Sequence, residues 1–414
     1  MIRILNSSDM GRVLARRAAR LSDAEATVRP ILDAVRKHGD KALVEYARQF
    51  DRLDRKSVAV PVSELAAAET RLSEEFRSAV QVATDNIRAF AQAQLPREQM
   101  HELKPGLRAG QIVRPLDAVA AYIPAGRYPL PSTLMMTVVP AQVAGVPNVC
   151  VACPRAVDEV FGTAHMLGVN RVFQMGGAQA IAAFAFGTKT VPRVDRIVGP
   201  GNIYVAAAKK LLAGEVGIDF IAGPTEILII ANEGDARFIA ADMLAQAEHD
   251  VDASAILLTT SKRLANSVAK EIERQLITLP TSPVARKAID RNSAIIIVRS
   301  ANEAVDLSNR FAPEHLSIQD ETLLPKLRHA GSVFLGPFSP EAAGDYAAGP
   351  NHVLPTSGAA RLRGGLSVMD YVKVISVQQL SESALRDLAS AITTLARAEG
   401  LEAHARSVEV RTHA

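Results

Sequence analysis

The sequence is poor in aromatic residues and in cysteine. Its 414 residues include no tryptophan, 4% aromatic residues and two cysteines. A protein surface that binds nucleic acid by base stacking needs more aromatic side chains, and the net charge of +3 is scattered along the chain without a basic stripe. We therefore expect no nucleic-acid partner. The core must be aliphatic, which agrees with a hydrophobic content of 48%, ordinary for a globular protein.

Long apolar segments are also missing. No apolar run reaches the roughly 18–20 residues that cross a bilayer. The first 26 residues, MIRILNSSDMGRVLARRAARLSDAEA, lack the apolar stretch of a secretory signal. These absences predict a cytoplasmic protein that has no membrane partner.

The two cysteines, Cys150 and Cys153, have the C-x-x-C spacing of a redox motif. They lie in the apolar segment NVCVACP, which predicts a buried strand and not the helix N-terminus that stabilises a thiolate. Two thiolates also cannot form a four-thiolate zinc site. We expect both cysteines to be structural.

The hydrophobic pattern changes along the chain. Residues 1–115 have mostly helical spacing, whereas from about 117 short β-branched runs alternate with helical segments, and a second such series begins near 226. This alternation predicts parallel sheets covered on both faces. Because 414 residues exceed one typical core, we predict an α/β protein with two Rossmann-like parallel-sheet units, a helical N-terminal region and a C-terminal helical tail.

Three glycine-rich turns follow predicted strands of the first series and lead into helices. They are YIPAGRYPLPST (122–133), MGGAQA (175–180) and GPGN (199–202), whereas the G-x-G-x-x-G and P-loop fingerprints are absent. Glycines let a ligand approach the backbone, and helix N-termini favour anions. The turns indicate a nucleotide site, although simple tight turns would look the same.

Short polar clusters mark the second series. They are QAEH (246–249), PEH (313–315), DYAAGPNH (345–352) and EGLEAH (399–404). Imidazole and carboxylate groups are ligands of catalytic zinc, and histidine is the usual general base. Each histidine alone could equally be a surface or core residue, so the residues by themselves predict a metal or proton-transfer site and no particular reaction.

Eight segments in fixed order resemble the signature blocks of the histidinol dehydrogenase family. They are YIPAGRYPLPST, GGAQAIAAFAFGT, VDRIVGPGN, IAGPTE, QAEH, APEHL, AGDYAAGPNHVLPT and EGLEAH. The resemblance implies oxidation of L-histidinol to L-histidine through the aldehyde, the last step of histidine biosynthesis, with two NAD consumed and one zinc ion per subunit. It also implies a homodimer with shared active sites.

The resemblance assigns site residues position by position. It implies that Glu314 and His315 are the catalytic bases. The implied zinc ligands are Gln246, His249, Asp345 and His404, and the implied NAD contacts are Tyr122, Gln179 and Asn202. The implied substrate contacts are Thr225, Gln246, His249, His315, Asp345, His352, Glu399 and His404.

With these roles, we expect four regions. Residues 1–20 would form a helical arm, and residues 21–121 with 225–366 a first α/β globule carrying most of the zinc and catalytic site. Residues 122–224 would form the nucleotide-binding globule, and residues 367–414 a tail reaching the partner subunit of an intertwined dimer.

The sequence departs from the family pattern at a few positions. Thr225 replaces a serine but keeps the hydroxyl, whereas Ala125, Arg127 and Tyr128 change the first glycine-rich turn and could alter the nucleotide mouth. A related zinc and NAD dehydrogenase for another amino or sulfonated alcohol is therefore an alternative. A zinc hydrolase is a second alternative, which the glycine-rich turns disfavour, and a ligand-binding homologue without activity is a third, which the complete set of bases and ligands disfavours.

Overall fold

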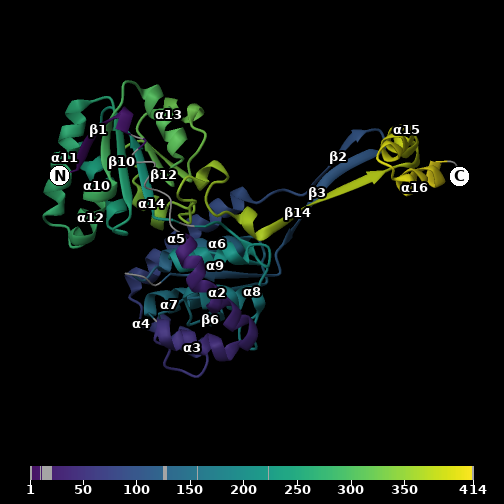
Figure 1. The fold of residues 1–414 in the computed structure, drawn as a ribbon, viewed down its shortest axis with the longest axis horizontal. Coiled ribbons are helices and arrows are strands. Elements are labelled where there is room, and N and C mark those ends of the chain that lie inside the picture. The colour runs from purple at the N-terminus through teal and green to yellow at the C-terminus, as the bar shows by residue number, and fades with distance from the viewer. Residues whose placement is uncertain are drawn as a thin grey trace.

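The computed structural model describes residues 2–9, 11, 21–124, 128–155, 157–221 and 223–412. These residues form two parallel-sheet units side by side and an arm that projects far from both (Figure 1). Within the described ranges, no helix combines the length and apolarity that a bilayer crossing requires.

The five-stranded unit contains a parallel sheet in the order β6-β5-β4-β7-β8. The strands are β4 (Ala118–Tyr122), β5 (Asn148–Ala152), β6 (Arg171–Phe173), β7 (Arg196–Val198) and β8 (Gly217–Ile218). Helices α4 (Val62–Arg71), α5 (Glu74–Gln94), α6 (Pro131–Val143) and α7 (Asp158–Met166) cover one face. Helices α2 (Leu21–His38), α3 (Asp40–Asp51), α8 (Gly177–Phe186) and α9 (Ile203–Leu212) cover the other.

The six-stranded unit is also parallel, in the order β1-β11-β10-β9-β12-β13. The strands are β1 (Arg3–Asn6), β9 (Glu226–Ile230), β10 (Ser254–Thr259), β11 (Ala294–Ile297), β12 (His315–Ile318) and β13 (Ser332–Leu335). The helices are α10 (Ala236–Ala247), α11 (Lys262–Leu276), α12 (Ser282–Asn292), α13 (Ala301–Phe311) and α14 (Glu341–Tyr346). Strand β9 is buried at every residue because helices pack on both of its faces.

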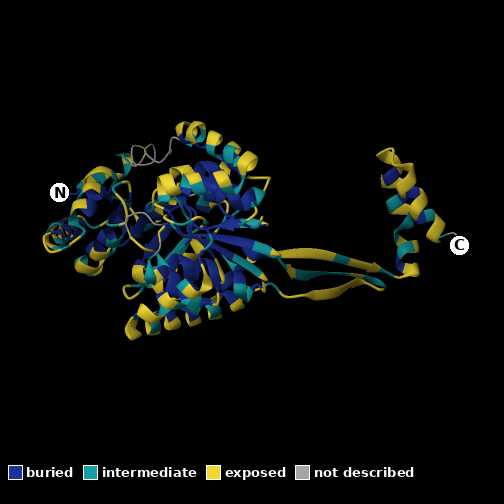
Figure 2. Ribbon diagram, turned by 90° about the horizontal axis from the view of Figure 1, so that it is seen from below, coloured by how far each residue is buried: buried dark blue, intermediate teal, exposed yellow. Residues whose placement is uncertain are grey.

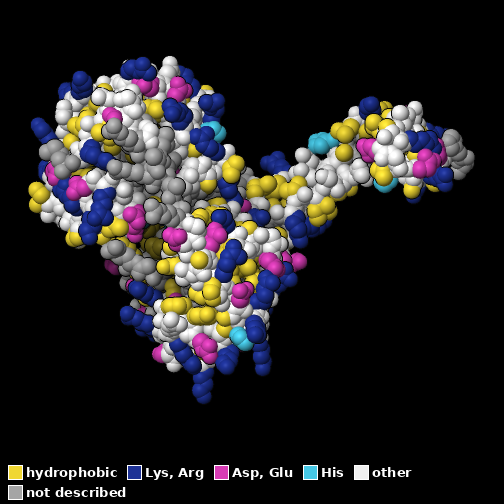
Figure 3. Space-filling view, viewed as in Figure 1, with side chains coloured by type: hydrophobic (Ala, Val, Ile, Leu, Met, Phe, Trp, Pro, Cys, Tyr) yellow, Lys and Arg dark blue, Asp and Glu magenta, His cyan; other side chains and the backbone are white. Residues whose placement is uncertain are grey.

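The arm is an antiparallel sheet in the order β14-β3-β2, followed by two helices. Its elements are β2 (Gln99–Lys104), β3 (Leu107–Pro115), β14 (Val372–Leu380), α15 (Glu382–Ala398) and α16 (Glu402–Thr412). Strands β2 and β14 are largely solvent-exposed, and β3 between them is mostly half-buried (Figure 2). Hydrophobic side chains such as Leu103, Leu395 and Val410 are 62–68% exposed there, and Figure 3 shows apolar surface on the arm.

The two parallel-sheet units share one topology. Counted within each unit, the strand order is 3-2-1-4-5, with β1 added at the edge of the six-stranded sheet. This order places a topological switch point between β4 and β7 in one unit and between β9 and β12 in the other. The prediction of two Rossmann-like parallel-sheet units is confirmed, and the shared order shows a similarity that the sequence did not reveal.

The structure divides the chain differently from the four expected regions. Helices α2–α5 and all but the last residue of β4 come from residues 21–121, and they pack in the five-stranded unit and not with residues 225–366. The reason is that β4 is the central strand of that sheet, and its two faces need covering. Residues 3–6 form an edge strand of the six-stranded sheet instead of a helix, and residues 10 and 12–20 lie outside the described residues.

Residues 99–115, expected to be helical, form the hairpin of β2 and β3. The turn between the two strands contains Pro105 and Gly106, and Gly106 has a φ of 76°. Pro-Gly between two short runs is a hairpin signal, which the helical spacing of the flanking regions obscured.

Candidate active site

Glu314 and His315 lie at the amino end of β12, beside the amino end of β9. Both side chains are buried, with 8% and 5% of their surfaces exposed. The Glu314 carboxylate accepts a hydrogen bond from Thr225 Oγ1 at 2.6 Å and one from the Glu226 backbone N–H at 2.8 Å. Burial raises the pKa of Glu314, although the neighbouring His315 and these two donors oppose the shift.

His315 is surrounded by carboxylates. Its Nδ1 donates to the Glu226 carbonyl at 3.2 Å and lies 3.6 Å from an oxygen of Glu341, and its Nε2 lies 3.7 Å from Asp345 Oδ1. Burial alone would lower the pKa of His315, but Glu341, Glu314 and Asp345 outweigh burial and raise the pKa to about 10. A divalent cation among these carboxylates would neutralise part of their charge and return the imidazole towards neutral pKa values.

Three of the predicted metal ligands lie on or directly after helices α10 and α14, close to Glu314 and His315. Gln246 lies in the last turn of α10, His249 follows that helix, and Asp345 lies on α14. The possible ligand atoms of His249, Asp345 and Glu341 all lie within 4.8 Å of one another. The Gln246 carboxamide donates to Thr225 Oγ1 at 2.8 Å, which places it beside Glu314.

Buried atoms without hydrogen-bond partners surround the same place. Within the described part of the chain, no partner is found for Gln246 Oε1, His315 Nε2 or either oxygen of Glu341. Buried polar groups are ordinarily satisfied because leaving them unpaired is costly. The three oxygen atoms are acceptors, and His315 Nε2 is an acceptor when the imidazole is neutral, so the site fits a divalent cation together with a polar ligand.

Glu341 is the residue that the sequence analysis missed. It precedes Asp345 by four residues in PEAAGDY, so both carboxylates lie on one face of α14. Its side chain is 1% exposed, and burial raises its pKa well above the ordinary value, against the opposing effect of His315. The four-residue spacing was the available signal.

His352 joins this cluster to the five-stranded unit. Its Nδ1 donates to the Asp345 carbonyl at 2.6 Å, and its Nε2 lies 3.2 Å from Thr133 Oγ1 on α6. The adjacent Asn351 donates to the Met136 carbonyl on the same helix at 2.6 Å. Burial lowers the pKa of His352, partly opposed by Asp345, which favours the neutral imidazole. The predicted catalytic cluster therefore faces α6.

Two predicted site residues lie elsewhere in this chain. Glu399 caps the end of α15 and His404 lies on α16, both at the tip of the arm (Figures 1 and 2). Both are solvent-exposed. The arm holds them away from His249 and Asp345, so a single chain does not bring the complete predicted ligand set together.

The predicted nucleotide residues lie at the carboxyl edge of the five-stranded sheet. Tyr122 ends β4, and its buried hydroxyl accepts from the Gly177 N–H at 3.1 Å. Gln179 lies in the first turn of α8, and Asn202 caps α9 by accepting from the N–H groups of Tyr204 and Val205. These positions flank the switch point between β4 and β7, where ligands bind in doubly wound sheets.

Comparison with known proteins decides the family. The sequence model of histidinol dehydrogenase matches residues 14–412. The chain belongs to the histidinol dehydrogenase family. It is 48% identical over 395 residues to the histidinol dehydrogenase of Bacillus anthracis, covering 94% of this chain and 92% of that one. It is 47% identical over 410 residues to that of Geobacter metallireducens, covering 96% and 94%.

Solved structures agree with this assignment. The crystal structure of histidinol dehydrogenase from Elizabethkingia anophelis superimposes with a TM-score of 0.95 at 36% identity, over 99% of this chain and 98% of that one. An acetylating aldehyde dehydrogenase from Geobacillus thermoglucosidasius, at 12% identity and a TM-score of 0.51 over 89% of this chain and 96% of that one, shares the fold alone.

Other sequence features of this family member have simple structural outcomes. Cys150 and Cys153 are buried and form no disulfide, and burial raises the pKa of each thiol to about 11, as expected for a structural pair. Tyr128 is 42% exposed beside α6. Ala125 and Arg127, the other departures from the histidinol dehydrogenase pattern, lie outside the described residues.

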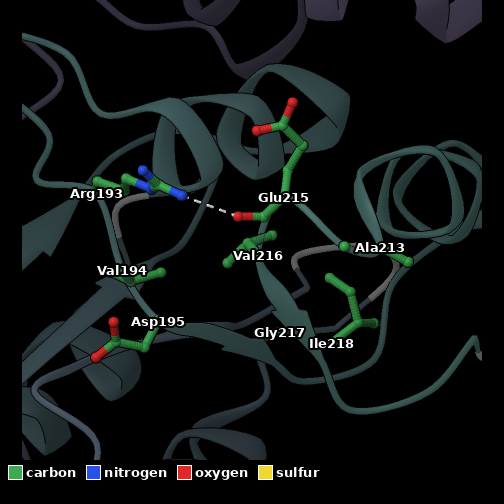
Figure 4. Close-up of a pocket in the computed structure, with 9 residues that line it drawn as sticks. Arg193, Val194, Asp195, Ala213, Glu215, Val216, Gly217 and Ile218 are labelled. Atoms are coloured by element: carbon green, nitrogen blue, oxygen red, sulfur yellow. Dashed lines mark hydrogen bonds between the residues drawn. The ribbon is translucent and has the colours of Figure 1, made fainter. Parts of the chain in front are cut away.

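A hollow on the five-stranded unit lies apart from all predicted site residues. It is lined by residues 193–195 and 213–218, at the amino ends of β7 and β8. Arg193 crosses it to donate to the Glu215 carbonyl at 3.1 Å (Figure 4). It therefore occupies the sheet edge opposite Tyr122 and Asn202.

Proposed function

We propose that this chain oxidises L-histidinol to L-histidine in two NAD-dependent steps through the aldehyde, the last reaction of histidine biosynthesis. Family membership supports the reaction class. The observation that carries the proposal is the buried pair Glu314 and His315 beside the group formed by His249, Glu341 and Asp345. We place this biosynthetic enzyme in the cytoplasm.

Gln246, His249 and Asp345 would hold zinc in this chain. The unpartnered Oε1 of Gln246 and the proximity of His249 to Asp345 support this assignment. Zinc, when bound, supplies positive charge that orients the amine and imidazole nitrogens of histidinol. Thr225 and His352 flank the cluster. We assign them as substrate contacts together with Gln246, His249, His315 and Asp345 of the same chain.

His315 is the base for the first step. Its Nδ1–H is directed to the Glu226 carbonyl, so Nε2 is the atom left to take the proton of the substrate hydroxyl. NAD supplies the hydride acceptor. We assign its contacts to Tyr122, Gln179 and Asn202, at the switch point of the five-stranded unit.

Glu314 serves the second oxidation. The carboxylate is fixed by Thr225 and the Glu226 N–H, and burial makes it a stronger base than an exposed carboxylate. It takes a proton from the water that adds to the aldehyde, with His315 assisting. The resulting gem-diol loses its hydride to a second NAD, and the product is the acid.

A homodimer would complete the site. The tail residues Glu399 and His404 lie at the tip of an arm with exposed apolar side chains, whereas the metal cluster is on the six-stranded unit. Burying those side chains against a second copy is favourable. The arm of one copy would then deliver His404 as the fourth zinc ligand and Glu399 as a substrate contact to the other copy.

A heterodimer test separates this arrangement from a self-contained chain. One copy carries His315→Asn and the other His404→Ala, and differently tagged copies are co-expressed so that the mixed dimer is purified. If tails are exchanged, one site has an intact base and an intact ligand set, and about half of wild-type NADH formation returns. Each variant homodimer is the control, with almost no activity. A mixed dimer as inactive as the homodimers rejects the exchange.

The reaction itself is tested by NADH formation. Histidinol and NAD are supplied to the purified chain, before and after chelation and after zinc is restored, beside a panel of other amino and sulfonated alcohols. Activity on histidinol that falls on chelation and returns with zinc is expected. Activity restricted to another alcohol, or no NADH at all, refutes the proposed substrate.

A further inference from the structure

Asp51 reaches the proposed NAD site from the N-terminal helices. It is the last residue of α3, and one of its oxygens, Oδ2, accepts two hydrogen bonds from the start of α8. The donors are the Gly176 backbone N–H at 2.8 Å and the Gln179 carboxamide at 3.0 Å. No motif in the glycine-rich turn itself points to this residue, which is 125 positions away from Gly176.

The glycine-rich turn packs closely against Asp51. A Cβ at Gly176 would lie 2.6 Å from Pro154 and 2.9 Å from Asp51 Oδ1. Gly177 has a φ of 59°, and a Cβ there would lie 2.7 Å from Gln179 Oε1. On the other side, the Gly177 N–H is held by the Tyr122 hydroxyl. Asp51 and Tyr122 thus fix the first turn of α8 from two directions.

The carboxylate of Asp51 determines which atom of the Gln179 carboxamide is free to contact a ligand. A carboxylate only accepts hydrogen bonds, so Asp51 takes the NH2 group of Gln179 and leaves Oε1 as the atom that can accept from a ligand. The carboxylate also occupies the positive end of α8, where a phosphate would otherwise bind. The ligand group that meets Gln179 must therefore be a neutral donor, such as a hydroxyl, and not a phosphate.

We propose that Asp51 is a positioning residue for NAD, which orients Gln179 to accept a hydrogen bond from an uncharged part of the dinucleotide. The proposal rests on the NAD dependence proposed above. Burial raises the pKa of Asp51 to about 6, against the two hydrogen bonds, so the group is a carboxylate at neutral pH.

The test measures NAD affinity by calorimetry on the zinc-loaded full-length protein. For Asp51→Ala we expect NAD binding to weaken about 10-fold, because one charge-assisted hydrogen bond is lost. The KM for NAD should rise by the same factor. The KM for histidinol, the zinc content and kcat at saturating NAD should stay unchanged. Asp51→Asn keeps an oxygen that can accept from both donors, so it should bind within about 3-fold of wild type. Asp54→Ala, on the exposed loop that follows α3, is the matched control.

A double-mutant cycle shows whether Asp51 acts through Gln179. Asp51→Ala combined with Gln179→Ala should bind NAD no more weakly than Gln179→Ala alone. Additive losses overturn the proposal, as does an Asp51→Ala protein that binds NAD like wild type. If wild-type protein binds no NAD, the proposed function fails, and the role of Asp51, which rests on it, fails with it. If wild-type protein binds NAD and Asp51→Ala binds it equally well, only the role of Asp51 fails.

A second pair of variants serves if Asp51→Ala does not fold. Gln179→Glu places a second carboxylate next to Asp51, and the repulsion between the two should weaken NAD binding. Adding Asp51→Asn supplies an amide N–H that can donate to the new carboxylate. Recovery of NAD affinity in the double variant supports the contact. Equal affinity in the single and double variants rejects it.

Discussion

The two parallel-sheet units share a strand order but use opposite edges of their sheets. In the five-stranded unit, Tyr122 and Asn202 lie at the carboxyl ends of strands, the usual place for ligands. In the six-stranded unit, Glu226 and His315 are the first residues of β9 and β12, so the proposed catalytic cluster lies at the amino edge. A shared topology therefore does not fix where the chemistry takes place.

The two places also differ in how their polar groups are satisfied. The glycine-rich turns are held by protein partners: Asp51 binds the Gly176 N–H, and Asp219 binds the Gly199 N–H and the buried Lys209. At the catalytic cluster, Gln246 Oε1 and both Glu341 oxygens have no hydrogen-bond partner among the described residues. The glycine-rich turns are therefore fixed by contacts within the protein, whereas the catalytic cluster has buried polar groups that a cation and a substrate would satisfy.

The largest predicted effect comes from the base. His315→Asn should reduce turnover by roughly 100-fold or more, the usual loss for a general base, with NAD affinity retained because Gln179 and Asp51 are untouched. Steady-state NADH formation and calorimetric NAD binding measure the two effects. Near-normal turnover would show that His315 is not the base. Loss of NAD binding would show that the catalytic cluster and the proposed NAD site are coupled.

A variant of Glu341, whose carboxylate accepts no hydrogen bond among the described residues, tests whether this residue belongs to the metal cluster. Glu341→Gln keeps the shape but removes the charge, and should weaken zinc retention by about 10- to 100-fold, as measured for residues that support metal ligands. Competition with a chelator measures it. Glu321→Gln, at an exposed position of the same unit, is the control. Equal zinc retention in both variants would exclude Glu341 from the site.

A pH-dependent prediction concerns Asp51 in the scaffold. Its folded pKa of about 6 lies above the ordinary value of 3.8 because of burial, so its contribution to stability is present below pH 4 and is lost as the pH rises through 6. Asp51→Asn cannot ionise and should gain stability relative to wild type over that interval, by at most about 3 kcal/mol. Urea unfolding at pH 4, 6 and 8 measures the difference, and a constant difference would contradict the shift.

The smallest effect is expected for the cysteines. The double variant Cys150→Ala/Cys153→Ala should retain wild-type turnover, because both thiols are buried and the hydrogen bond that Cys153 donates goes to the carbonyl of Arg155, which is not a predicted site residue. A lower melting temperature is expected from the lost packing volume. An inactive but folded double variant would show that the pair has a functional role.

The sequence by itself determined the family, the two parallel-sheet units and the residue types of the site. Strands such as EILII are recognisable because burial on both faces demands a continuous apolar run, and QAEH and PEH are recognisable because their chemistry is local. Glu341 was within reach too, through its four-residue spacing from Asp345.

Only the tertiary structure decided the rest. In the structure, α2–α5 pack on the five-stranded sheet, and Glu314 lies at the amino edge of the other sheet. His404 lies on the arm, away from the cluster, and Asp51 contacts a turn that is far from it in the sequence. None of these has a local signal, because each depends on which apolar faces pack together over long separations. Packing partners are chosen by the whole set of faces that must be buried, and a single segment does not contain that information.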